Sequence, residues 1–87
     1  MDLDIWDALT DEEKWKQPYE EQFAVARLAV SQLLAKGVWG AAKASVANRF
    51  GEPVIHVFTT QESSVPYPNQ SVRYYGFRCF IAHVRAI

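Results

Sequence analysis

The side chains best suited to chemistry in this chain are two histidines, His56 and His83, and a single cysteine, Cys79. The three could form a metal site, but no CxxC or HxxxH spacing brings such ligands together locally. Catalysis requires a positioned acid, base, nucleophile or metal. Both histidines are flanked by apolar residues in stretches that resemble strands, which favours a structural role for them over a catalytic one. We therefore expect no catalytic residues, no metal site and no cofactor, and predict that the protein is not an enzyme.

Cys79 stands between Arg78 and Phe80. An adjacent arginine can lower the pKa of a thiol, but neighbouring side chains in a strand point to opposite faces of the sheet. The spacing therefore predicts a buried, unreactive thiol.

The composition indicates one small cytoplasmic domain. The N-terminus has neither the basic start nor the apolar run of a secretory signal, and no stretch reaches the ~20 apolar residues of a membrane span. One cysteine allows no internal disulfide. Of the 87 residues, 49% are hydrophobic and 14% aromatic. Because a chain this short buries only about 60% of its unfolded surface, we expect apolar surface left over for a partner.

Charge is divided unevenly along the chain. Residues 1–22 hold eight acidic and two basic side chains, a net charge of −6, and residues 23–87 hold seven basic and two acidic ones, a net charge of +5. Two interpretations stay open: the acidic head pairs with the basic body, or it faces a basic partner or masks a basic surface.

Helical patterns fill the first half of the chain. Thr10 and Glu13 have the spacing of a capping box, which predicts a helix that ends before Pro18. Apolar residues in 1–9 indicate that this stretch packs onto the body. A second helix is expected over 18–36, apolar around its circumference and therefore central and largely buried. Trp39, Ala42, Val46 and Phe50 recur at helical spacing, which predicts a third helix that stops at Gly51.

The second half has the pattern of strands. Residues 54–60 are β-branched and aromatic, 61–70 read as a loop, and 71–87 read as a long strand in which Gly76 marks a bulge or sharp bend. We expect the two strands to pair antiparallel. The predicted fold is a single α+β domain: two to three N-terminal helices (an acidic segment 1–17 and a helical part 18–50) packed on a C-terminal two-stranded antiparallel β-hairpin (53–87). The open edge of the last strand predicts a homodimer that extends the sheet.

These features favour a small non-catalytic protein-binding module. Tyr67 lies between two prolines, and a preorganised tyrosine suits an interface because little entropy is lost on binding. Compact size and the lack of catalytic groups fit a stoichiometric inhibitor or adaptor, such as a phage or mobile-element accessory protein acting on a host defence complex. The candidate contact residues are Tyr67, Arg73, Tyr75 and Arg78, with the acidic turn Asp11, Glu12 and Glu13 as a second surface.

The alternative is a nucleic-acid-binding domain. Helices followed by a hairpin have the element order of a winged-helix domain, although the expected third helix and the loop hold few cations. In the last strand, Arg73–Phe80 (RYYGFRCF) resembles the aromatic ribonucleoprotein motif of RNA-recognition domains over eight residues. That resemblance implies that Tyr75 and Phe77 stack on bases from one face of the sheet.

Overall fold

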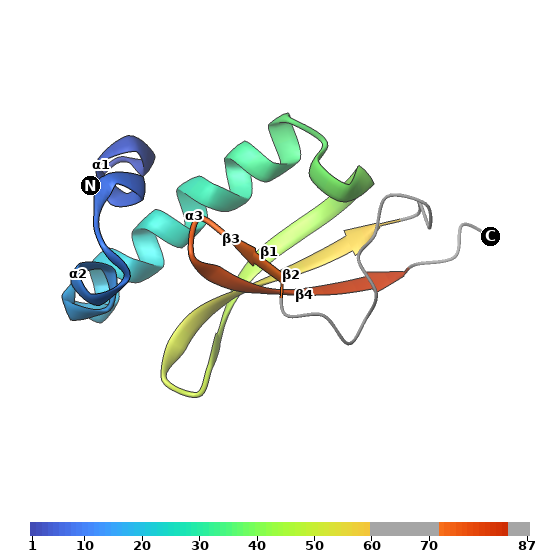
Figure 1. Ribbon diagram of the computed structural model, residues 1–87. Helices are drawn as coiled ribbons and strands as arrows, with labels where there is room; N and C mark the ends of the chain where they lie inside the picture. Colours follow the sequence, from blue (N-terminus) through green and yellow to red (C-terminus); the bar gives the residue numbers. More distant parts are fainter. Residues whose placement is uncertain (60–71, 84–87) are drawn as a thin grey trace.

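The computed structural model describes residues 1–59 and 72–83, in which helices precede a four-stranded sheet (Figure 1). The elements are α1 (Leu3–Ala8), α2 (Asp11–Lys16), α3 (Tyr19–Ala35), a 3₁₀ turn η1 (Val38–Gly40), and strands β1 (Ala41–Arg49), β2 (Glu52–Thr59), β3 (Val72–Tyr74) and β4 (Phe77–His83). The strand order is β1-β2-β4-β3. Helices and strands combine as the predicted α+β class requires, but the sheet is mixed and four-stranded, so the prediction of a two-stranded hairpin is wrong.

α2 and α3 start and stop where the sequence indicates, whereas α1 was not predicted. Thr10 and Glu13 form the predicted capping box, in which the Glu13 backbone N–H donates to Thr10 Oγ1 (3.2 Å) and the Thr10 N–H to Glu13 Oε1 (3.1 Å). α3 ends before Gly37, which adopts a left-handed φ of 61°. Within the described residues, no helix is both long and apolar enough to cross a membrane.

The third predicted helix does not form; most of that segment is the edge strand β1. η1 follows α3, and Trp39 within it has a φ of 54°. A right-handed helix cannot continue through a residue with this positive φ. The pairing of β1 with β2 is antiparallel, with one register shift between Ala41 and Lys43 and a regular register from Lys43 to Arg49. Phe50 and Gly51 join the two strands. Pairing with β2 therefore outweighs the helical spacing of a few alanine-rich positions.

The long C-terminal strand is in fact two strands. Tyr75 (φ 51°) and Gly76 (φ 85°) form a turn, so Gly76 does mark the sharp bend, but the chain reverses there and β3 pairs antiparallel with β4. β4 runs parallel, not antiparallel, to β2. β3 pairs with Phe77, Arg78 and Cys79 of β4, so it covers this part of the edge expected for a sheet-extending dimer. The edges of the described sheet are β1 and β3, and the dimer stays a prediction.

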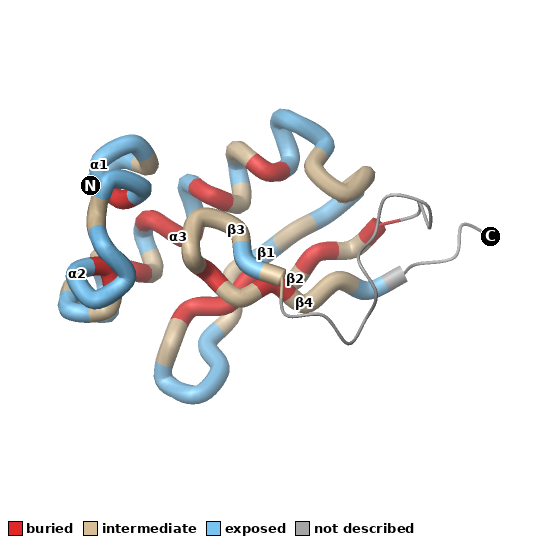
Figure 2. Tube along the Cα trace, viewed as in Figure 1, coloured by how far each residue is buried: buried red, intermediate tan, exposed pale blue. Residues whose placement is uncertain are grey.

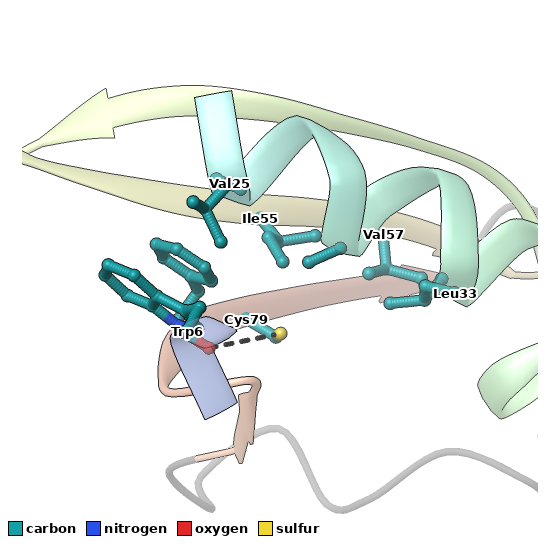
Figure 3. Close-up of a cluster of buried hydrophobic side chains, with 9 residues drawn as sticks. Trp6, Val25, Leu33, Ile55, Val57 and Cys79 are labelled. Carbon is teal, nitrogen blue, oxygen red and sulfur yellow. Dashed lines mark hydrogen bonds between the residues drawn. The ribbon is translucent and has the colours of Figure 1, made fainter. Parts of the chain in front are cut away.

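The main core lies between α3 and one face of the sheet (Figure 3). Val25 and Leu33 of α3 and Ile55 and Val57 of β2 are fully buried there. The opposite side of α3 is exposed, as the alternating colours along the helix show (Figure 2). Leu28 is 44% exposed and Leu34 37% exposed, so the prediction of a largely buried helix is wrong; α3 is covered on one side only.

An aromatic cluster joins the N-terminal segment to the β3–β4 turn. The Trp6 ring stacks on Phe77 with centroids 5.1 Å apart and an interplanar angle of 4°, and Trp15 meets both rings edge-on at 5.9 Å. Trp6 Nε1 also donates a hydrogen bond to the carbonyl oxygen of Tyr75 at 2.7 Å. The stretch 1–9 therefore packs onto the body, as its apolar residues predict.

Cys79 faces the core, and its thiol is buried as predicted (Figure 3). Burial raises the pKa of this thiol from 9.0 to about 12. The folded protein thus holds the thiol proton more tightly than the unfolded chain does. The contribution of Cys79 to stability is therefore complete below pH 9 and is lost as the pH rises from 9 towards 12, by at most about 1.4 kcal/mol per pH unit.

Denaturant unfolding of the native protein and of Cys79→Ala, at about pH 8 and about pH 10.5, checks this pH dependence. The native protein is expected to lose more stability between the two pH values than the variant, which shares every other titrating group. An equal loss in both proteins would show that the thiol titrates as in the unfolded chain.

Candidate functional site: an aromatic and basic sheet face

The face of the sheet opposite α3, here called the open face, collects most of the basic residues of the strands. Side chains alternate between faces along a strand, and directly paired residues share a face. Lys43 pairs with Phe58, Ser45 with His56, and Arg73 with Arg78. By this register the open face comprises Lys43, Ser45, Ala47 and Arg49 of β1, Glu52, Val54, His56 and Phe58 of β2, Arg73 of β3, and Arg78, Phe80 and Ala82 of β4. Val54 is fully buried, and the other residues of this face are exposed or half-buried.

The described residues of this face carry a net charge of +3, from four cations and the carboxylate of Glu52. Lys43, Arg49 and Arg73 are exposed and Arg78 is half-buried. In the part of the chain that the structure describes, no carboxylate lies within ion-pair distance of these cations. Arg73 and Arg78 stand directly opposite each other, an unfavourable arrangement that an anion lying between them would relieve.

Rings lie among these charges. The Phe80 ring stacks on His56 with centroids 5.6 Å apart and an interplanar angle of 28°. The Arg49 guanidinium carbon lies 4.7 Å from the Phe80 centroid, a cation–π contact that holds the planar group over the sheet. Phe58, His56 and Phe80 are half-buried. The open face therefore combines rings with cations that have no anionic partner among the described residues.

The predicted contact residues divide between surfaces. Arg73 and Arg78 both lie on the open face, and Arg73 Nη1 donates to the Gly76 carbonyl at 2.9 Å. Tyr75 does not lie there: it occupies the β3–β4 turn and lines a shallow groove beside α1 and α3. Phe77 is fully buried under Trp6, so the stacking pair implied by the ribonucleoprotein motif is wrong. Tyr67 lies outside the described residues.

The acidic turn lies on α2, and its carboxylates already have local contacts. The Thr10 backbone and hydroxyl bond to Glu13 and hold the pKa of its carboxyl below the usual value. Glu12 pairs with Lys16 at 3.1 Å, and Asp11 lies 4.0 Å from Lys14.

The acidic head makes its described ion pairs within itself. Besides the two on α2, the N-terminal ammonium pairs with Glu21 at 2.7 Å. The intramolecular interpretation expects acids of the head to pair with cations of residues 23–87. Among the described residues, no such pair is present.

Several open-face residues were not expected as contacts: Lys43, Arg49, His56, Phe58 and Phe80. In the predicted helix over 39–50, Lys43 and Arg49 would lie on different sides of the helix. In the strand that forms instead, both residues lie on the same face of the sheet. The alternation of polar and apolar residues from Lys43 to Val46 is the signal that would have indicated this strand. His56 and Cys79 face opposite sides of the sheet and so share no site, and the side chain of His83 lies outside the described part.

No protein-family model, curated protein or solved structure matches this chain.

Proposed function

We propose that the protein is a non-catalytic binding protein and that an anionic partner docks on the open face of its sheet. The observation that carries this proposal is the group of four cations on one sheet face, with one acid among the described residues of that face. The whole chain has a net charge of −1, so this charge is concentrated on the face rather than a property of the protein as a whole. A local basic field of this kind attracts anions and speeds association.

The placement of the acidic residues supports the same surface. The acid-rich helices α1 and α2 lie near the start of α3 and the β3–β4 turn, and not beneath the strands (Figure 1). The thiol is buried and Glu13 is engaged in a helix cap, so neither suits a role in chemistry. Two classes of partner fit the charge: an acidic protein surface, as expected of a stoichiometric inhibitor or adaptor, and a nucleic acid.

Retention on immobilised heparin, a polysaccharide polyanion that belongs to neither class, tests whether the face binds anions. The native protein is expected to be retained at low salt despite its net negative charge. The double variant Arg73→Ala/Arg78→Ala is expected to elute at clearly lower salt, because two of the four face cations are removed.

The matched control is Lys16→Ala/Lys36→Ala, which removes the same charge from exposed positions outside the strands. Its elution is expected to stay close to that of the native protein. Equal shifts in the two double variants, or no retention of the native protein, would contradict the proposed surface.

A further inference from the structure

Phe50 is a large aromatic side chain that the fold leaves almost entirely in solvent. It is 85% exposed and lies in the turn of the β1–β2 hairpin, directly after Arg49. It also has a φ of 56°, and Gly51 after it has a φ of 74°, as in the primed turns of tight hairpins. Glycine, asparagine and aspartate are favoured where φ is positive, so folding gains nothing from phenylalanine here.

The second hairpin supplies a comparison within the same chain. Tyr75 and Gly76 also pair an aromatic residue with a glycine at positive φ. The Tyr75 ring packs edge-on against Tyr74 at 4.9 Å, and its carbonyl accepts the Trp6 hydrogen bond. Phe50 makes no ring contact with any described residue and does not join the core. An exposed ring in a strained turn beside a basic face points to a use outside the fold.

We propose that the anionic partner is a single-stranded nucleic acid, an inference that rests on the proposed function. Its phosphates would bind the open-face cations, and one of its bases would stack on Phe50. Proteins that bind single strands without sequence preference combine cations that follow the backbone with exposed rings that stack on bases. Lys43, Arg49, Arg73 and Arg78 supply the first component, and Phe50 supplies the second.

The shape of the surface favours a single strand over a duplex. Four strands spaced about 4.8 Å apart span about 14 Å before side chains are added, which exceeds the ~12 Å major groove. A duplex also keeps its base faces stacked inside the helix, where Phe50 could not reach them. Unpaired bases present those faces, and they are the usual targets of aromatic side chains on sheets.

Arg49 links the two components. Its guanidinium is held on the Phe80 ring, and it precedes Phe50 in the chain. A guanidinium fixed in this way keeps N–H groups for a phosphate oxygen, and this preorganisation reduces the entropy lost on binding. A base on Phe50 and its own phosphate on Arg49 would thus be gripped by adjacent residues.

Fluorescence anisotropy with a fluorescein-labelled oligo(dT) of about twelve nucleotides tests this assignment, with a labelled duplex and labelled poly-L-glutamate as the other probes. Phe50→Ala is expected to weaken oligo(dT) binding by about fivefold or more, because the stacked base is lost. The same change is expected to leave folding intact, since the ring is exposed, and a thermal melt checks this. Tyr19→Ala removes an exposed ring from α3 and is expected to leave the affinity unchanged.

These three probes, together with heparin retention, separate this inference from the proposed function. Binding of poly-L-glutamate and heparin without oligo(dT) would overturn the nucleic-acid assignment and leave an anion-binding face that suits an acidic protein. Binding of none of the polyanions would overturn both. Equal or tighter binding of the duplex, or an unchanged oligo(dT) affinity in Phe50→Ala, would overturn the single-strand stacking arrangement.

Discussion

Trp6→Ala is expected to lower the free energy of unfolding by about 3–5 kcal/mol, a large share of the stability of a domain of this size. Trp6 is fully buried, stacks on Phe77 and meets Trp15 edge-on. Its removal leaves a cavity among aromatic rings and also frees the Tyr75 carbonyl that its indole N–H binds. Urea denaturation followed by circular dichroism measures the change.

Two further variants show where this stability arises. Trp6→Phe keeps a ring against Phe77 but removes the N–H donor, so a smaller loss of about 1–3 kcal/mol is expected. Ile5→Ala alters a neighbour on α1 that is 54% exposed, and a change within about 0.5 kcal/mol is expected. If Trp6→Ala were as mild as Ile5→Ala, the N-terminal segment would not be docked on the β3–β4 turn.

The sequence was sufficient for the features that depend on local chemistry. The capping box at Thr10, the end of α3 at Gly37 and the burial of Cys79 each follow from a few neighbouring residues, and the structure confirms them. β1 was missed because alanine-rich segments with apolar residues at helical spacing satisfy two patterns, and only pairing with β2 decides between them. The parallel pairing of β2 with β4 is a long-range contact that no local pattern indicates.

Only part of the candidate site could be predicted from the sequence, because the rest depends on long-range strand pairing. Arg73 and Arg78 were identified from their aromatic, basic neighbourhood, and both lie on the open face. Tyr75 was misplaced because the long strand was not seen to reverse at Gly76, and Phe77 because its burial under Trp6 depends on a contact 71 residues away in the chain. Lys43 and Arg49 could be grouped with the others only once β1 was known to be a strand.

Neutralising the open face is expected to have the largest effect on binding. The variant Lys43→Gln/Arg49→Gln/Arg73→Gln/Arg78→Gln is expected to lose about a hundredfold or more in affinity for the labelled oligo(dT) at about 50 mM salt. Phosphate contacts supply most of the affinity of proteins that bind nucleic acid without sequence preference, and these side chains are the cations of this face. Three of them are exposed, so the fold is expected to be kept, and far-UV circular dichroism checks it.

The salt dependence of this binding is the most direct measurement of whether the open face is the binding surface. If four cations hold phosphates of a single strand, the logarithm of the association constant falls with the logarithm of salt concentration with a slope of about −3. Affinity would then drop about fiftyfold between about 50 and 200 mM salt. That slope is expected for the native protein, and a slope close to zero is expected for the four-site variant. A native slope near zero, or the same steep slope in both proteins, would contradict this expectation.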